Sequence, residues 1–316
     1  MARTPLPELA VSNSPSGRPA PDRSTVANLL VSMRPGEWTK NLFVFAGLLF
    51  GQRLTDSTAV LRSLGAFAIF CALAGVVYLV NDVMDREQDG QHPRKRYRPI
   101  ASGALEPRTA LMAGLAVAAG GLGAAWWMGP PLGVVATAYL LLLVLYSGPL
   151  KHIVIIDVLT IAIGFELRVV AGAVAVAVPM SPWLLICTIL LALFLGLSKR
   201  RHELTLLADG AIGHRRILQE YSPYLLDQMI GVVTASTLMA YILYATSHET
   251  AEKFGTSLLG LTIPFPLYGI FRYLYLVHQR GVGSPSEVLL TDRPIALCIG
   301  LWGLAVIAII YRRFGL

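Results

Sequence analysis

Charged residues are scarce in this chain. Asp, Glu, Lys and Arg make up 14% of the 316 residues, whereas 55% are hydrophobic and the mean hydropathy is +0.61. So few charges are atypical of a soluble domain, and the apolar runs approach the roughly 20 residues with which a helix spans a bilayer. The composition predicts an all-α, polytopic membrane protein.

Cysteine is also rare, which argues against a disulfide scaffold or a cysteine-based metal centre. The chain has three, Cys71, Cys187 and Cys298, and each lies inside an apolar stretch without metal-ligand spacing. We interpret them as small core residues.

The first 27 residues lack the apolar segment of a secretory signal and are rich in Pro, Ser and Arg. We expect 1–27 to be a disordered cytoplasmic tail and 28–316 to be one transmembrane domain. The net charge of +7 does not indicate a nucleic-acid partner, because the basic residues lie in short loops between apolar segments.

Nine apolar segments are expected to span the membrane. They cover residues 40–54, 58–82, 108–128, 131–148, 153–177, 182–199, 225–247, 255–277 and 293–312. With the N-terminus inside, most Arg and Lys fall in the cytoplasmic loops 83–107, 149–152, 200–224 and 278–292, as the positive-inside rule requires. Arg53 and the terminal Arg312-Arg313 are exceptions.

An acidic motif, Asn81-Asp82-x-x-Asp85-x-x-x-Asp89, closes the second apolar segment. On one continuous helix the three aspartates would lie within about 60° of each other. Converging carboxylates repel each other unless a cation joins them, and oxygen ligands suit Mg²⁺. The motif therefore predicts a magnesium diphosphate site, the alternative being a solvated helix cap.

One basic sequence follows this motif directly, and three others are expected on the same cytoplasmic face. They are His92-Pro93-Arg94-Lys95-Arg96-Tyr97-Arg98-Pro99, Arg34-Pro35-Gly36-Glu37-Trp38-Thr39-Lys40-Asn41, Tyr146-Ser147-Gly148-Pro149-Leu150-Lys151 and Lys199-Arg200-Arg201-His202-Glu203. Each could bind phosphate at the cytoplasmic face. The alternatives are an interfacial anchor for the second sequence and topogenic charges for the last two.

Charges also occur inside the fifth apolar segment, where each is costly unless it faces a cavity or a partner. Asp157, Gly164 and Arg168 share one helical face, and Glu166 points roughly the other way. Asp157 and Arg168 are therefore the candidates for a cavity wall, although Arg168 could equally be a structural pairing residue.

The acidic motif and the nine expected spans resemble the UbiA superfamily of intramembrane prenyltransferases, over about residues 30–312. The resemblance implies helices around a lipid-open cavity and two aspartate-rich loops that hold Mg²⁺ against a diphosphate, on the cytoplasmic face of a bacterial inner membrane. The first motif matches residue for residue. The second, usually Asp-x-x-x-Asp near the end of the sixth span, is replaced by Lys199-Arg200-Arg201-His202-Glu203.

This departure resembles one branch of the superfamily, which moves 5-phosphoribose from phosphoribosyl diphosphate onto a polyprenyl phosphate such as decaprenyl phosphate. The similarity includes Arg34-Pro35, Trp38, Lys40-Asn41, Tyr78-Leu79-Val80-Asn81-Asp82, His92-Pro93, Arg98-Pro99 and Lys199-Arg200 with Glu203. Additional cations suit substrates that carry a diphosphate, a 5-phosphate and a lipid phosphate.

The resemblance assigns hypothetical roles within this transferase domain. Asp82, Asp85 and Asp89 would hold Mg²⁺, and Asn81 would bond the sugar or the metal shell. The basic residues expected to bind substrate phosphates are Arg34, Lys40, Arg94, Lys95, Arg96, Arg98, Lys151, Arg168, Lys199 and Arg200. The substrate-binding set is completed by Asn41, Tyr146 and Glu203. No general base is expected, because the lipid phosphate is already anionic.

Two other functions remain open at this point. In an aromatic prenyltransferase, Glu203 and Asp209 would serve as a degenerate second acidic motif and a polyprenyl diphosphate would be the donor. A transporter or lipid-binding protein would also contain intramembrane charges, but no inverted repeat is evident. The isoprenoid length and the oligomeric state are left undetermined by the sequence.

Overall fold

The computed structural model describes residues 23–92, 95–208, 216–279, 288 and 291–312. None of these residues forms a strand, so the expected all-α fold is confirmed. Most of the expected tail, residues 1–22, lies outside the described residues. Its last three residues, 25–27, belong instead to the first helix.

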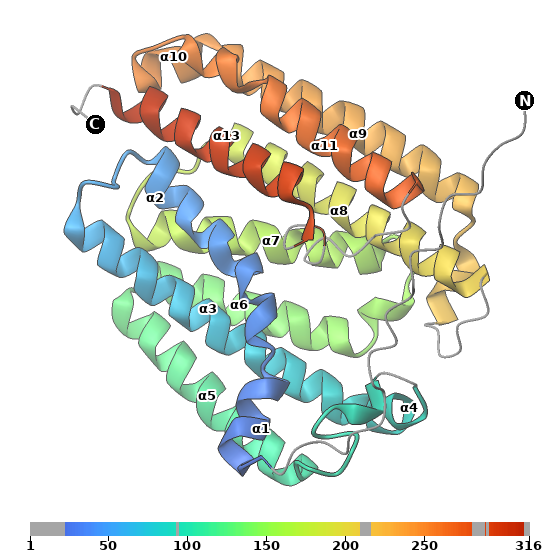
Figure 1. Ribbon diagram of the computed structural model, residues 1–316. Helices are drawn as coiled ribbons and strands as arrows, with labels where there is room; N and C mark the ends of the chain where they lie inside the picture. The colour runs from blue at the N-terminus through green and yellow to red at the C-terminus, as the bar shows by residue number, and fades with distance from the viewer. Residues whose placement is uncertain (1–22, 93–94, 209–215, 280–287, 289–290, 313–316) are drawn as a thin grey trace, which may run out of the picture.

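The helices follow one another through short connections (Figure 1). In chain order they are α1 Thr25–Ser32, η1 Pro35–Phe45, α2 Ala46–Phe50, α3 Ser57–Met84, α4 Arg86–Gln91, η2 Lys95–Tyr97, α5 Pro107–Met128, α6 Pro130–Ser147, η3 Leu150–His152, α7 Ile156–Ala175, α8 Pro182–Ala208, η4 Arg216–Glu220, α9 Pro223–Thr246, α10 His248–Phe254, η5 Leu258–Thr262, α11 Pro264–Gln279 and α13 Arg293–Tyr311.

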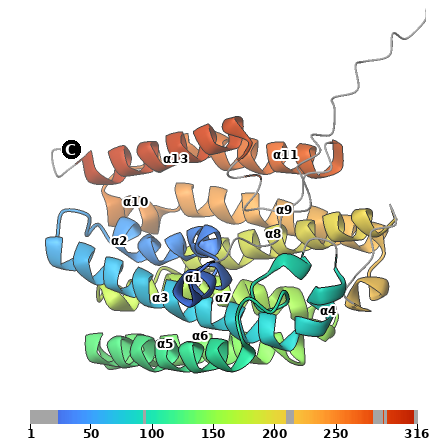
Figure 2. The same cartoon turned by 60° about the horizontal axis from the view of Figure 1, so that its bottom comes forward.

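The long helices lie side by side in one bundle (Figures 1 and 2). Their starts follow local sequence signals: Asp56, Ser222 and Asp292 cap α3, α9 and α13 through side-chain oxygens that accept backbone N–H groups. The short helix α4 lies at one end of the bundle, and α2, α10 and the end of α13 lie at the other (Figure 1). The first of these ends contains the predicted site.

Seven described helices are long and apolar enough to cross a membrane, and α10 with the segment Leu258–Gln279 makes an eighth if this pair, bent by 103°, counts as one span. The expected span 40–54 is not a single α-helix. Residues 35–50 make a 3-10 helix of 11 residues and an α-helix of 5. With rises of about 2.0 and 1.5 Å per residue, they extend roughly 30 Å, which is the thickness of the hydrocarbon core.

Two glycines allow the η1–α2 segment to pass between α3 and α7. A Cβ on Gly172 of α7 would lie 1.8 Å from the carbonyl oxygen of Val44, and a Cβ on Gly47 would lie 2.6 Å from the backbone nitrogen of Ala173. The two backbones are therefore in direct contact, closer than any side chain would permit.

Arg168 stabilises the contact between the η1–α2 segment and α7 from inside the bundle. Its Nε donates to Asn41 Oδ1 at 2.7 Å, its Nη2 to Tyr139 Oη at 2.6 Å, and its Nη1 to the carbonyl oxygen of Gly164 at 2.7 Å. Arg168 also stacks on the rings of Tyr139 and Phe165. The arginine thus joins η1, α6 and α7, and this geometry favours the structural role left open by the sequence.

The close contact at Gly172 is testable. We expect Gly172→Ala to lower the melting temperature of the purified protein in detergent, because the new methyl group would overlap a backbone oxygen that cannot move independently of η1; overpacking of this kind costs about 1–3 kcal/mol. Gly300→Ala on α13 is the matched control, since nothing lies within 4 Å of its Cβ position. Equal melting temperatures for both variants would contradict the proposed packing.

Candidate active site

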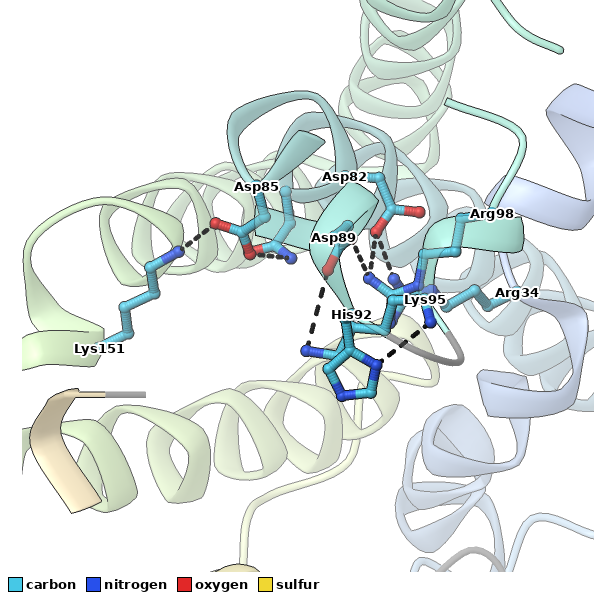
Figure 3. Close-up of polar contacts among 9 residues, drawn as sticks. Arg34, Asp82, Asp85, Asp89, His92, Lys95, Arg98 and Lys151 are labelled. Carbon is cyan, nitrogen blue, oxygen red and sulfur yellow. Dashed lines mark hydrogen bonds and ion pairs between the residues drawn. The ribbon is translucent and has the colours of Figure 1, made fainter. Parts of the chain in front are cut away.

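The predicted acidic motif lies where the end of α3 meets α4, η2 and the start of η1 (Figure 3). Asp82 is 2% exposed. Arg34 pairs with its Oδ1, and Nη1 of Arg98 approaches the same oxygen at 3.1 Å. Nη1 of Arg98 also lies 2.5 Å from Oδ2 of Asp89, and the ammonium of Lys95 is 3.8 Å from the other oxygen of Asp89. Arg98 therefore bridges two buried carboxylates.

Arg34 reaches Asp82 from a strained backbone position. Its φ of 52° and ψ of 67° are left-handed, which is uncommon for a residue other than glycine, and Pro35 follows it as the first residue of η1. The guanidinium also stacks 4.7 Å above the ring of Tyr78. Such conformations persist where the surroundings impose them, and they often occur at functional sites.

Asp85 does not join the Arg98 bridge. The expectation of one continuous helical face through the three aspartates is wrong, because α3 ends at Met84 and α4 begins at Arg86, with Asp85 at φ −91° and ψ 8° between them. Asp85 Oδ1 accepts from Lys151 Nζ at 3.0 Å, and its Oδ2 accepts from Asn81 Nδ2 at 3.0 Å (Figure 3). The helix break thus turns Asp85 toward η3.

The donor set suits Mg²⁺ by its chemistry, because it consists of carboxylate and amide oxygens. Within the described ranges no group of three or more His, Cys, Asp and Glu side chains is close enough to hold a metal ion. Arg34, Arg98 and Lys151 hold the aspartates instead.

A second ionic cluster lies at the end of α8 and is largely buried. Arg200 is 2% exposed; its Nε donates to Asp157 Oδ2 at 2.8 Å, its Nη1 to Glu203 Oε2 at 2.5 Å and its Nη2 to Tyr146 Oη at 3.2 Å. Asp157 is fully buried, so its predicted position on a cavity wall is wrong for the described structure. Arg200 links α6, α7 and α8 and is not an open phosphate ligand.

Tyr221 completes this cluster. Its hydroxyl donates to Asp157 Oδ1 at 2.8 Å and accepts from the backbone N–H of Ile155 at 2.7 Å. Burial, reinforced by the neighbouring Asp157 carboxylate, raises the pKa of Tyr221 to about 12, so the hydroxyl stays protonated and can donate at neutral pH. No sequence pattern indicated this residue, because it lies in a connection between helices.

Glu37 connects the two clusters electrostatically, and the sequence analysis gave it no role. It pairs with Lys40 on the next turn of η1, and its carboxylate lies within electrostatic reach of Lys199 and Arg34. Lys199 in turn is 3.9 Å from Glu203 Oε1. Its place between Arg34 and Lys40 in the sequence was the only available signal.

Three of the predicted substrate ligands lie outside both ionic clusters, and a fourth falls outside the described residues. Arg96 is exposed, and its Nη2 donates to Tyr97 Oη at 2.7 Å, outside the Arg98 bridge. Arg168 and Asn41 are bonded to each other within the bundle. Arg94 lies outside the described residues, as does Asp209 of the alternative acidic motif.

Comparisons with known proteins agree on one family. Residues 41–289 match the family described as the UbiA prenyltransferase family. The chain is 32% identical over 303 residues to the decaprenyl-phosphate phosphoribosyltransferase of Mycolicibacterium smegmatis, covering 92% of this chain and 95% of that one. It is 30% identical to the enzyme of the same name from Corynebacterium glutamicum, covering 92% and 89%.

Solved structures share the fold. A UbiA homologue from Archaeoglobus fulgidus, bound to DMAPP and Mg²⁺, superposes with a TM-score of 0.69 at 17% identity, covering 90% of this chain and 99% of that one. At 17% identity the likeness shows the helical fold alone and assigns no role to individual residues.

The Arg98 bridge predicts that substitutions of Arg98 and of its carboxylate partner have non-additive effects on the free energy of unfolding. Arg98→Met should destabilise the protein by about 3–5 kcal/mol, because two buried carboxylates lose a shared cation. The double variant Arg98→Met/Asp89→Asn should recover part of this loss, since Asp89 would otherwise be left with the 3.8 Å contact to Lys95 in place of its near cation. Arg201→Met is the control, because its pair with Asp227 is more exposed and worth roughly 0–1 kcal/mol. Thermal or denaturant unfolding in detergent measures all three, and strictly additive losses would contradict the bridge.

Proposed function

Since the chain belongs to the UbiA prenyltransferase family and is a membrane-embedded transferase, we propose that it moves 5-phosphoribose from phosphoribosyl diphosphate to a polyprenyl phosphate, releasing diphosphate. The 28–316 region would form the catalytic domain, with decaprenyl phosphate as the acceptor suggested by the relatives' names. The site would face the cytoplasm, because the basic connections lie at its end of the bundle.

The composition of the site is the observation that carries this proposal. Four cations, Arg34, Lys95, Arg98 and Lys151, surround the three aspartates. The place where the family's second acidic motif would lie holds Lys199-Arg200 with Glu203, so it adds no net acidic charge. A prenyl diphosphate has one charged group, whereas the proposed donor and acceptor together carry a diphosphate and two phosphates. The cation excess matches the larger negative charge.

In the proposed reaction Arg34, Arg98 and Lys151 exchange their carboxylate partners for phosphate oxygens of the donor. Asp82, Asp85 and Asp89 would then be free to hold Mg²⁺, which neutralises the leaving diphosphate when bound. Lys95 would add a further cation. Lys40, which pairs with Glu37 and holds none of the three aspartates, would be left for the lipid phosphate.

The lipid phosphate oxygen would form the new bond to C1 of the ribosyl group as the bond from C1 to the diphosphate oxygen breaks. The acceptor oxygen is already anionic at neutral pH, so no side chain has to remove a proton. The protein's contribution on this proposal is to hold both anions close together and to exclude water from the reacting carbon. Asn81, which bonds Asp85, would keep that carboxylate oriented.

A paired assay tests the reaction. Purified protein with Mg²⁺ receives labelled phosphoribosyl diphosphate and polyprenyl phosphate in one tube, and polyprenyl diphosphate with 4-hydroxybenzoate in the other. We expect label to enter the lipid phase in the first tube, with one diphosphate released per transfer. Product in the second tube alone would overturn the proposal in favour of an aromatic prenyltransferase.

Asp85→Asn tests the role of the motif with little risk to the fold, because Asp85 is partly exposed whereas Asp82 is buried. We expect turnover to fall at least 100-fold and the Mg²⁺-dependent part of donor binding, measured by calorimetry without acceptor, to disappear. Asp227→Asn, which alters an ion pair between α8 and α9, should leave both unchanged. Full activity of Asp85→Asn at saturating Mg²⁺ would contradict the assignment.

A further inference from the structure

The carboxylate of Glu203 is held in place by its ion pair with the buried Arg200. Arg200 bonds it at 2.5 Å and is itself fixed at 2.8 Å by Asp157, which is fully buried and also bonded by Tyr221. The guanidinium has little rotational freedom when its Nε and both Nη atoms are bonded. The Glu203 side chain remains 28% exposed, so part of this held acceptor is accessible from outside the protein.

Two chains of contacts connect Glu203 with the acidic motif. Tyr146, bonded to Arg200, lies at the end of α6 five residues before Lys151, which pairs with Asp85. On the other side, Lys199 acts on both Glu203 and Glu37, and Glu37 is within electrostatic reach of Arg34, the partner of Asp82. Glu203 is therefore linked to the proposed diphosphate site through Glu37 and through the connection between α6 and η3.

The charges around Glu203 are already balanced. Asp157 and Glu203 carry two negative charges, and Arg200 and Lys199 carry two positive charges. A divalent cation at Glu203 would lie close to two fixed cations, which disfavours the metal-binding role of the acids in the family's second motif. A phosphate would be repelled by the carboxylate. A neutral hydroxyl group can donate to a carboxylate oxygen without disturbing the balance.

We propose that Glu203 is the specificity-determining residue for the donor, accepting a hydrogen bond from a ring hydroxyl of its ribosyl group, and that Arg200 and Asp157 are the positioning residues that hold it. This inference rests on the proposed function. At neutral pH the 2- and 3-hydroxyls are the main hydrogen-bond donors that phosphoribosyl diphosphate offers, and a prenyl diphosphate offers none. A carboxylate in this place therefore distinguishes a sugar donor from a prenyl donor.

The test compares Glu203→Gln with the wild type on three donors: phosphoribosyl diphosphate and its 2-deoxy and 3-deoxy analogues. With the full donor we expect kcat/KM of the variant to fall about 10- to 100-fold, the effect of losing a hydrogen bond to a charged acceptor. With the analogue that lacks the contacted hydroxyl, the two proteins should agree within about twofold. Dividing kcat/KM of the variant by that of the wild type on the same donor cancels the intrinsic reactivity of that donor.

If Arg200 and Asp157 position Glu203, a change at Asp157 should affect the same donors as a change at Glu203. Asp157→Asn should show the same donor-selective loss, because Arg200 would lose the charge that fixes it, and Glu203→Asp, which keeps the charge, should show a smaller but equally selective loss. Asp227→Asn is the matched control on the neighbouring α8–α9 pair. If Glu203→Gln fails to fold, as judged by its melting temperature, Glu203→Asp takes its place in the comparison of the three donors.

Each contrary result has a distinct meaning. Equal losses on all three donors, or a raised Mg²⁺ requirement for donor binding in Glu203→Gln, would overturn the hydroxyl contact while leaving phosphoribosyl transfer intact. A wild-type protein that transfers no label from phosphoribosyl diphosphate would overturn the proposed function and this inference together.

Discussion

Buried carboxylates at one end of the bundle are paired with basic side chains, and the rest of the site depends on this pairing. Arg98 joins Asp82 to Asp89, and Arg200 holds Asp157. A carboxylate buried without a partner costs several kcal/mol, so each pair also fixes the chain segments that supply it. α3, α4 and η2 are connected by the first pair, and α7 and α8 by the second. The pairing positions the side chains that substrates would meet.

The helical bundle supplies a rigid frame for these charges. The η1–α2 segment crosses between α3 and α7 only because Gly47 and Gly172 let backbones touch, and Arg168 closes the crossing through Asn41 and Tyr139. This crossing ends at Arg34, whose left-handed backbone directs its guanidinium to Asp82. The same segment thus carries both the close backbone contact with α7 and, at its start, one of the proposed phosphate ligands.

Composition and hydropathy were sufficient to predict the all-α membrane fold, because a helix that crosses lipid requires a long run of apolar residues. The motif from Asn81 to Asp89 was likewise evident from its residues. Its geometry was not, because the helix breaks at Asp85 and this residue pairs with Lys151, a contact 66 residues apart. The same limit applies to Arg200: the sequence gives it the character of a surface phosphate ligand, and only the tertiary structure brings Asp157 and Tyr146 to it.

The central claim is that arginines and lysines now bound to the aspartates move to the donor's phosphates while the aspartates take the metal. A cryo-electron microscopy structure of the protein with phosphoribosyl diphosphate and Mg²⁺ tests it most directly. The account predicts metal density against Asp82, Asp85 or Asp89, with Arg98 and Lys151 on phosphate oxygens. A donor bound elsewhere, with Arg98 still bridging Asp82 and Asp89, would contradict it.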